Sequence, residues 1–286
     1  MSRRGALLFA AMCVIWGIPY LLIRVAVREI SPAALVLGRT TIAALILLPL
    51  AAIRGELGLS RRHLAPLVAF AAIEIMLPWL LLGDAETRLT SSLTGLLIAG
   101  VPLVGALVTT FTGERERHGA GRWTGLFVGL VGVAAIVGLD VHNAAPLPLA
   151  EVAIVAVCYA VGPIVLVRWL NDAPSLGVVA ASLTIAALCY APVAAFALPR
   201  ALPGWKVNAS VATLAAVCTA LAFVIFFQLI AETGPVRATV ITYVNPAVAA
   251  ILGVTVLNER FTLGMGVGFA LVLAGSVLAT RTVEPA

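Results

Sequence analysis

The chain of 286 residues is 62% hydrophobic and only 11% charged, and its mean hydropathy is +1.11. Too few polar residues remain to cover a soluble globule of this length, which excludes water-soluble enzymes and binding domains and indicates an integral membrane protein. The net charge of +5 comes mainly from arginines scattered between apolar segments, a pattern that orients a membrane protein and does not indicate nucleic-acid binding.

Ten apolar segments of helical length follow one another along the chain. Each is close to the roughly 20 residues that cross a hydrocarbon core about 30 Å thick. The first follows Ser2, Arg3 and Arg4 in the manner of a signal peptide, but nine similar segments come after it, so we expect a structural helix. We predict an all-α membrane protein with ten transmembrane helices at approximately 5–27, 32–53, 64–83, 90–112, 122–139, 149–170, 175–198, 209–231, 235–257 and 263–281.

The second half of the chain repeats the first at an offset of 142 to 146 residues. Adding 143 to Glu116 and Gly125, for example, gives Glu259 and Gly268. The sequence therefore predicts two five-helix repeats, 1–142 and 143–286. Because five crossings is an odd number, the second repeat must be inverted, which is a recurring construction of secondary transporters. In the first repeat, most arginines lie in loops on the same side of the membrane as the N-terminus, and arginine-rich loops are typically cytoplasmic. Ten crossings return the chain to that side, so we expect both termini in the cytoplasm.

Arg39 and Glu74 are the two charges most clearly inside the apolar segments. Neither has a charged counterpart in the other repeat, because the offset places Arg39 on Ser182 and Glu74 near Cys218. A helix rises 1.5 Å per residue, so the two charges lie at depths that differ by only about 4 Å and could meet. We expect Glu74 to hold a substrate ammonium group or a coupling proton, and Arg39 to serve mainly the scaffold by binding backbone carbonyls.

Prolines occupy corresponding positions in the two repeats. We expect Pro19 and Pro163 to interrupt the first and sixth helices, either as packing kinks or as hinges beside the transport path. Pro102 and Pro246 carry the same alternatives. Together with Arg39, these four prolines form the predicted structural or hinge set.

Aromatic side chains complete the predicted substrate site. Trp79 on the third segment and Phe223, Phe226 and Phe227 on the eighth would form an apolar wall, with lipid-facing rings as the alternative. The predicted substrate-binding residues are Trp16, Tyr20, Glu74, Trp79, Tyr159, Phe223, Phe227, Tyr243 and Asn245. Trp123, Trp169 and Trp205 stand at segment ends, where tryptophan anchors helices at the membrane interface.

Residues for metal, cofactor or catalytic chemistry are missing from the sequence patterns. His63, His118 and His142 fall in loops, and the four cysteines lie in apolar segments without CxxC spacing. A nucleotide-binding loop, an HExxH motif and a paired-aspartate metal motif are all absent. We therefore expect no cofactor, no metal and no enzymatic activity, and a scaffold without transport activity fits poorly with buried charges in broken helices.

Several of these features are shared with one large family. The chain resembles the drug/metabolite transporter superfamily in its EamA-type ten-helix branch, and in layout the amino-acid exporters of the YddG kind. The resemblance rests on Trp16, Gly17 and Arg24, on Arg39, on Pro102 followed by Gly113 and Glu114 or Glu116, on Pro246 followed by Asn258, Glu259 and Arg260, and on the glycines Gly125, Gly132, Gly268 and Gly275. It implies a central cavity that opens to each side in turn.

The predicted function is a secondary transporter that exports small metabolites across the inner membrane by alternating access. The resemblance favours amino acids as substrates, aromatic and other neutral ones included. The alternative is a carrier of a sugar phosphate, nucleotide sugar or nucleoside, although a phosphate would require several cations in the cavity and Arg39 is the only one clearly at membrane depth. The expected partners are a small-molecule substrate and the lipid bilayer, with no nucleic acid, and we expect a monomer.

Overall fold

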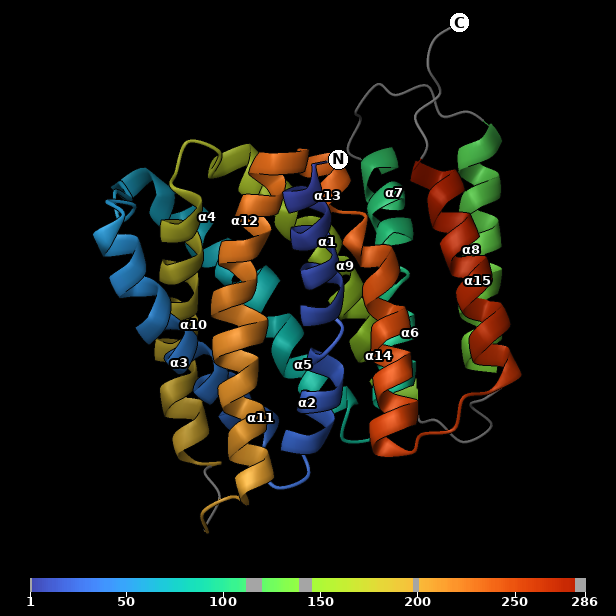
Figure 1. The fold of residues 1–286 in the computed structure, drawn as a ribbon, viewed down its shortest axis with the longest axis horizontal. Coiled ribbons are helices and arrows are strands. Elements are labelled where there is room, and N and C mark those ends of the chain that lie inside the picture. Colours follow the sequence, from blue (N-terminus) through green and yellow to red (C-terminus); the bar gives the residue numbers. More distant parts are fainter. Residues whose placement is uncertain (1, 112–119, 139–145, 198–200, 281–286) are drawn as a thin grey trace, which may run out of the picture.

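The computed structural model describes residues 2–111, 120–138, 146–197 and 201–280, which form a bundle of helices (Figure 1). Each of the ten predicted segments corresponds to one helix, straight or broken. The first five are α1 (Arg3–Ile15) with α2 (Pro19–Ala26), α3 (Pro32–Ile53), α4 (Leu64–Phe70) with α5 (Leu77–Ala85), α6 (Ser91–Ile98) with α7 (Val101–Phe111), and α8 (Ala120–Gly138). The second five are α9 (Pro146–Trp169), α10 (Ser175–Ala195), α11 (Trp205–Ala215) with α12 (Ala222–Thr233), α13 (Pro235–Ala238) with α14 (Ile241–Leu257), and α15 (Leu263–Thr280).

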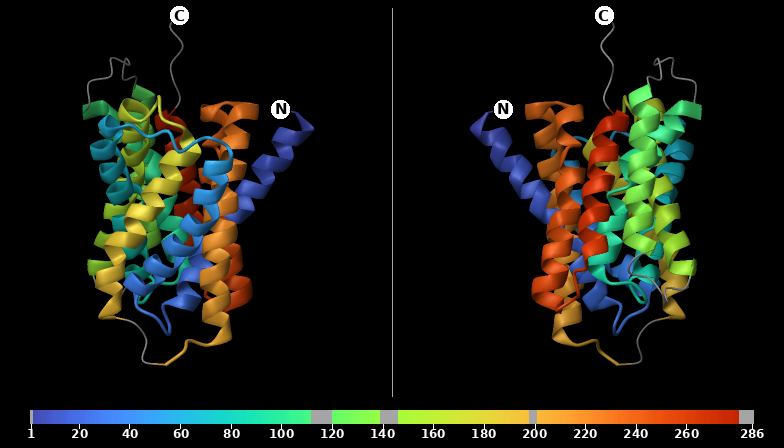
Figure 2. Two further views of the ribbon diagram at one scale, coloured as in Figure 1. Left: turned by 90° about the vertical axis from the view of Figure 1, so that its left-hand side faces the viewer. Right: turned by 90° about the vertical axis from the view of Figure 1, so that its right-hand side faces the viewer.

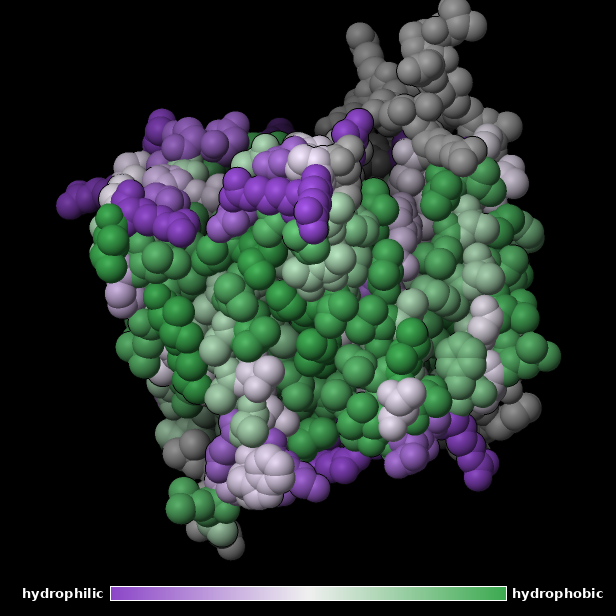
Figure 3. All heavy atoms as spheres, viewed as in Figure 1, coloured by the Kyte–Doolittle hydropathy of each residue, from purple (hydrophilic) through white to green (hydrophobic). Residues whose placement is uncertain are grey.

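The helices meet the length and apolarity that a bilayer requires. Within the described residues, eight stretches are long and apolar enough to span a membrane, and two shorter apolar helices, Gly121–Val137 and Ile241–Leu257, complete the ten. Figure 3 shows an apolar belt around the middle of the bundle, with hydrophilic side chains gathered at its two edges. Trp123, Trp169 and Trp205 lie at helix ends and are half or more exposed, in agreement with interface anchoring. The prediction of a ten-helix membrane fold is confirmed.

Local sequence explains where several helices begin. Ser31 precedes Pro32, and its Oγ accepts a hydrogen bond of 3.2 Å from the backbone N–H of Ala34 at the start of α3. Thr90 does the same for Leu93 at the start of α6. A side-chain oxygen at this position satisfies one of the four N–H groups that a helix leaves free, so these residues fix both starting points.

Helix packing follows the predicted repeat. The second helix packs on the seventh (α3 on α10), the fourth on the ninth (α6 on α14), and the fifth on the tenth (α8 on α15). The first packs on the eighth (α1 on α12) as the sixth packs on the third (α9 on α5). Every one of these pairs is preserved when the two halves are exchanged, as expected for two related sets of five helices. Figure 2 shows in addition that the N-terminal end of α1 leans away from the bundle.

Proline interrupts the helices at one of the two expected places. The first helix breaks over Trp16–Ile18, before Pro19, and Gly17 in this break lies against α14, where an added Cβ would be 3.0 Å from the carbonyl oxygen of Asn245. In contrast, α9 continues through Pro163, because one missing hydrogen bond need not end a helix whose other bonds are kept. The expected interruption at Pro163 was therefore wrong. Pro102 lies in the first turn of α7, and Pro246 lies inside α14 without breaking it.

Glycines allow α8 and α15 to pack in direct backbone contact. A methyl group on Gly275 would lie 2.6 Å from both the carbonyl oxygen of Gly125 and the Cα of Gly129. We expect Gly275→Ala to force the helices apart and to lower the free energy of unfolding by about 1–3 kcal/mol. The thermal midpoint of the detergent-purified protein measures this change. Gly121→Ala, on α8 but with nothing within 4 Å, is the matched control, and equal midpoints for the two variants would contradict the close contact.

Candidate substrate site

Glu74 lies near the middle of the third transmembrane helix, 13 residues after Arg61 and 11 before Ala85. It belongs to a π-helical turn, Ala71–Met76, a widened form of helix that often marks functional sites. Its carboxylate rests against Gly162 of α9, which has no side chain to block it. Oxygen Oε2 is shielded from solvent and has no hydrogen-bond partner among the described residues. A buried, unpaired carboxylate oxygen is unfavourable, so the site has a strong preference for a proton or a cation.

Arg39 does not pair with Glu74. Its Nε donates a hydrogen bond of 2.9 Å to Oγ1 of Thr219, and its guanidinium stacks on the ring of Trp79, with Cζ 3.6 Å from the ring centroid. The ion pairs formed among the described residues do not include Glu74. The sequence predicts a similar depth for the two charges, but the packing of the helices places the guanidinium between Trp79 of the first repeat and Thr219 of the second. Its partners are a hydroxyl and a ring, not the backbone carbonyls that we expected.

Most of the predicted aromatic residues gather beside these charges. Ile75 directly follows Glu74 and lies in one hydrophobic cluster with Trp79. Tyr159, Phe223 and Phe227 pack against this cluster. Tyr159 is close enough to both Glu74 and Arg39 to interact with them electrostatically. Trp79, Tyr159, Phe223 and Phe227 thus lie in one cluster with Ile75, the residue that follows Glu74.

Two further aromatic residues extend this wall through their neighbours. Trp16 contacts Phe223 and Phe226, with ring centroids 6.0 Å and 4.7 Å apart. Tyr20 is buried and packs in one cluster with Tyr159. The break in the first helix therefore lies at one side of the aromatic wall, where both residues flank Pro19.

Tyr243 and Asn245 are not placed in this wall. The hydroxyl of Tyr243 lies 3.2 Å from that of Thr280, at the end of α15. Asn245 is buried. With its amide oriented so that the nitrogen faces acceptors, it donates hydrogen bonds of 2.9 Å to the carbonyl of Cys13 and 3.0 Å to the carbonyl of Ile241. This arrangement supports a packing role for Asn245, which ties α14 to the broken end of α1.

Thr219 is the residue of this region that the sequence did not single out. It lies in a second π-helical turn, Ala216–Leu221, and its hydroxyl donates 2.8 Å to the carbonyl of Leu214. The two π-helical turns are 145 residues apart, so Thr219, and not Cys218, is the structural counterpart of Glu74. An offset of 145 within the repeat could have identified it, but a single threonine in an apolar helix carries no signal of its own.

At the edge of the bundle away from the N-terminus, a half-buried glutamate and the backbone of a buried one join neighbouring helices. Glu259 accepts hydrogen bonds from the backbone N–H of Ser91 (2.9 Å) and Ser92 (2.8 Å) and from both hydroxyls. It thereby caps the N-terminus of α6, where a negative charge is favoured by the helix dipole. Arg24, at the end of α2, donates to the backbone carbonyl of Glu86, a fully buried residue at the end of α5.

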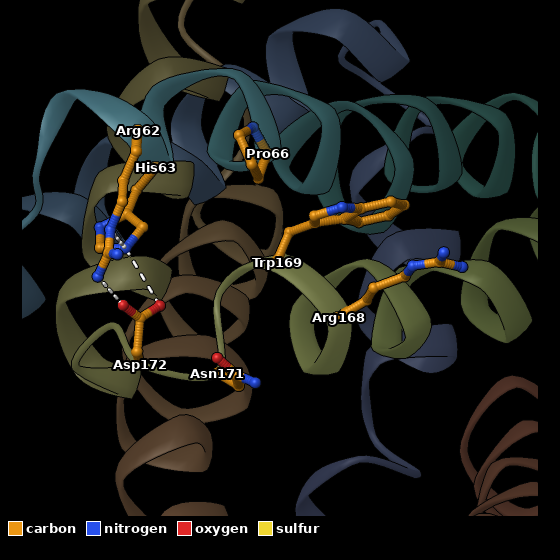
Figure 4. Close-up of a pocket in the computed structure, with 7 residues that line it drawn as sticks. All are labelled: Arg62, His63, Pro66, Arg168, Trp169, Asn171 and Asp172. Atoms are coloured by element: carbon orange, nitrogen blue, oxygen red, sulfur yellow. Dashed lines mark hydrogen bonds and ion pairs between the residues drawn. The ribbon is translucent and has the colours of Figure 1, made fainter.

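A pocket of about 470 Å³ opens at the opposite edge (Figure 4). Asp172 in the α9–α10 turn binds Arg62 and lies 3.2 Å from Nε2 of His63, joining this turn to the start of α4. Desolvation opposes ionisation of Asp172, but hydrogen bonds from its own backbone and from His63 and the charge of Arg62 outweigh it, so the pKa of Asp172 lies below its usual range. This pocket lies at the end of the helices, far from Glu74 in depth, and we assign it to the scaffold. It is lined by Arg62, His63, Pro66, Arg168, Trp169, Asn171 and Asp172.

Some predicted residues lie outside the described part of the chain. These are the acidic turn with Gly113, Glu114 and Glu116, together with His118 and His142. Within the described ranges, His, Cys, Asp and Glu side chains do not gather in groups of three or more that could hold a metal ion.

Comparison with known proteins places this architecture in a family. Residues 3–138 and 149–281 each match the EamA-like transporter family. The uncharacterized inner membrane transporter YedA of Escherichia coli strain K12 is 27% identical over 278 residues, covering 92% of this chain and 88% of that protein, and YedA of E. coli O157:H7 matches equally. A solved crystal structure superimposes with a TM-score of 0.69 over 98% of this chain and 97% of its own, at 19% identity, and shows a shared fold alone. The chain therefore belongs to the EamA-like transporter family and is a membrane transporter, not an enzyme.

Proposed function

We propose that the protein exports small metabolites, amino acids foremost, by alternating access. The observation that carries this proposal is Glu74, whose Oε2 has no partner among the described residues and which lies at mid-membrane depth beside an aromatic cluster. Such a site suits a molecule with an ammonium group and an apolar body. The π-helical turns and the break before Pro19 are places where helices bend with few lost hydrogen bonds, as a cavity that opens to each side requires.

A carrier of phosphorylated metabolites is less well supported. Binding a phosphate calls for several cations that point into the cavity. Arg39 is engaged with Thr219 and Trp79, and Glu74 beside the aromatic wall would repel an anion. The amino-acid proposal therefore fits the charges at this depth better.

Transport in proteoliposomes tests the proposal. We expect the purified protein to release preloaded radiolabelled neutral amino acids, and Glu74→Gln to reduce this flux at least about tenfold while folding normally, since the amide keeps the size but not the charge. Glu232→Gln, an exposed glutamate at the end of α12, is the matched control and should keep the flux. Wild-type flux in Glu74→Gln at every pH tested would contradict a role for the carboxylate.

The relative YedA is named as an inner membrane transporter, and we propose the same membrane for this protein. In the proposed orientation both termini lie in the cytoplasm. The arginines near α4 and the N-terminus then lie on the cytoplasmic side. Reporters fused after Arg62 and at the C-terminus should read as cytoplasmic, and one inserted within residues 140–148 as external. An external C-terminus would contradict this topology.

A further inference from the structure

The two π-helical turns are approached by corresponding helices. The Ala216–Leu221 turn packs against α3, and the Ala71–Met76 turn packs against α10. Tyr190 of α10 also donates 2.9 Å to the carbonyl of Met76, which fixes α10 beside the first turn. The contact between α3 and the second turn therefore has a counterpart between α10 and the first.

The residues at equivalent positions of these two contacts differ in charge. On the α3 side, the guanidinium of Arg39 reaches Thr219. On the α10 side, the offset of 143 puts Ser182 in place of Arg39, and the offset of 145 puts Glu74 in place of Thr219. One contact thus has a cation and a neutral acceptor, and the other has a carboxylate and a short neutral side chain.

The α10 side has polar atoms without partners. Ser182 is fully buried, and its Oγ has no hydrogen-bond partner in the part of the chain that the structure describes. The same is true of Oε2 of Glu74. Buried polar atoms are almost always paired, and each one left without a partner is destabilising. The serine side chain is much shorter than that of arginine. Among the described residues, the protein therefore supplies a guanidinium to one contact and no cation to the other.

We infer that the protonated amine or guanidinium of the transported molecule binds between Glu74 and Ser182, in the position that corresponds to the Arg39 guanidinium of the other half. This inference rests on the proposed function and specifies its substrate class as molecules with a cationic nitrogen group. Arg39 stacks on Trp79, and the offset of 145 from Trp79 leads to Val224, beside Phe223. Phe223 packs in the same cluster as Trp79, and we assign it the role toward the bound cation that Trp79 has toward Arg39.

Thermal unfolding of the purified protein with two probes tests this assignment. Phenethylamine carries the cationic group, and 3-phenylpropionate carries the same ring with a carboxylate. We expect phenethylamine to raise the midpoint of the wild type and 3-phenylpropionate to leave it unchanged. Glu74→Gln should weaken the affinity for phenethylamine about tenfold to a hundredfold, the loss of one charge-assisted hydrogen bond.

Ser182→Arg is the decisive variant because it attaches a guanidinium at the position that corresponds to Arg39. We expect it to unfold at or above the wild-type midpoint without any probe, through pairing with Glu74, and to lose the response to phenethylamine. Ser182→Ala keeps the space open but removes the hydroxyl, so it should weaken the response to phenethylamine less than Glu74→Gln does. If Ser182→Arg does not fold, the comparison of Glu74→Gln with Ser182→Ala decides.

Three results would overturn the assignment. They are a wild type that does not respond to phenethylamine, a response that survives in Glu74→Gln, and preferential binding of 3-phenylpropionate. Measured export of neutral amino acids together with any of these would leave the proposed function standing and place the amino group elsewhere. Binding of phenethylamine that depends on Glu74, without export of any amino acid, would support the site and reject the proposed substrates.

Discussion

Replacing Arg39 by alanine should reduce the yield of folded protein and lower its free energy of unfolding by about 2–4 kcal/mol. The change removes a charged hydrogen bond to Thr219 and a buried stacking contact with Trp79, and it leaves a cavity between the two repeats. The loss is limited because the desolvation penalty of the guanidinium is removed as well. Fluorescence-detected size-exclusion chromatography and the thermal midpoint measure the effect.

Two variants separate charge from packing at this position. Arg39→Met keeps much of the volume without the charge, and Arg39→Lys keeps the charge without the planar group that stacks on Trp79 and the Nε that binds Thr219. We expect both to fold better than Arg39→Ala and to keep part of the transport activity. An Arg39→Lys protein that folds at wild-type yield but transports nothing would reverse the roles, making Arg39 the docking group for an anionic substrate.

Replacing Glu259 by alanine should destabilise the protein by about 2–5 kcal/mol, through the start of α6. The backbone N–H groups and hydroxyls of Ser91 and Ser92 would lose their acceptor, and both serines are fully buried. Donors left unsatisfied at a buried helix N-terminus each cost about 1–3 kcal/mol, and the favourable interaction with the helix dipole is lost too. The contact between α6 and α14, one in each repeat, should loosen with it.

The neighbouring Arg260, which is exposed, provides the control for this turn. Arg260→Gln should unfold at the wild-type temperature, and Glu259→Gln should lie between it and Glu259→Ala because the amide keeps one acceptor oxygen. Hydrogen exchange at Ser91 and Ser92 should rise in Glu259→Ala before the rest of the bundle is affected. Unchanged protection there would show that α6 is capped by other means.

The helices and their order could be predicted from sequence because the bilayer imposes a simple requirement. A segment must be apolar and about 20 residues long, and both properties are local. All ten predicted segments overlap the observed helices, and their ends differ by a few residues. The breaks were harder to predict. Pro19 and Pro163 look alike in sequence, yet only the first coincides with a break, where Gly17 fits closely against α14.

The candidate site could be predicted in composition but not in pairing. Composition, spacing and the repeat offset led to Glu74 and to Trp79, Tyr159, Phe223 and Phe227, and these four aromatic residues share one cluster with Ile75, the neighbour of Glu74. Depth in the membrane follows from position along a helix, and for this reason Arg39 and Glu74 were expected to lie at similar levels. Depth does not tell which neighbouring helix a side chain points toward. Successive side chains are rotated by about 100° around the helix axis, so the rotation of the whole helix decides this.

Direction was decided by how the helices pack. The sequence by itself determined that this chain crosses a membrane in two related sets of five helices and carries an unmatched acidic residue inside one of them. Only the tertiary structure decided that Arg39 turns to Thr219, that Glu259 caps a helix of the other repeat, and that Tyr243 lies away from the aromatic wall. The physical reason is that each of these contacts joins helices far apart in the chain, and their relative rotation is set by the packing of many side chains together.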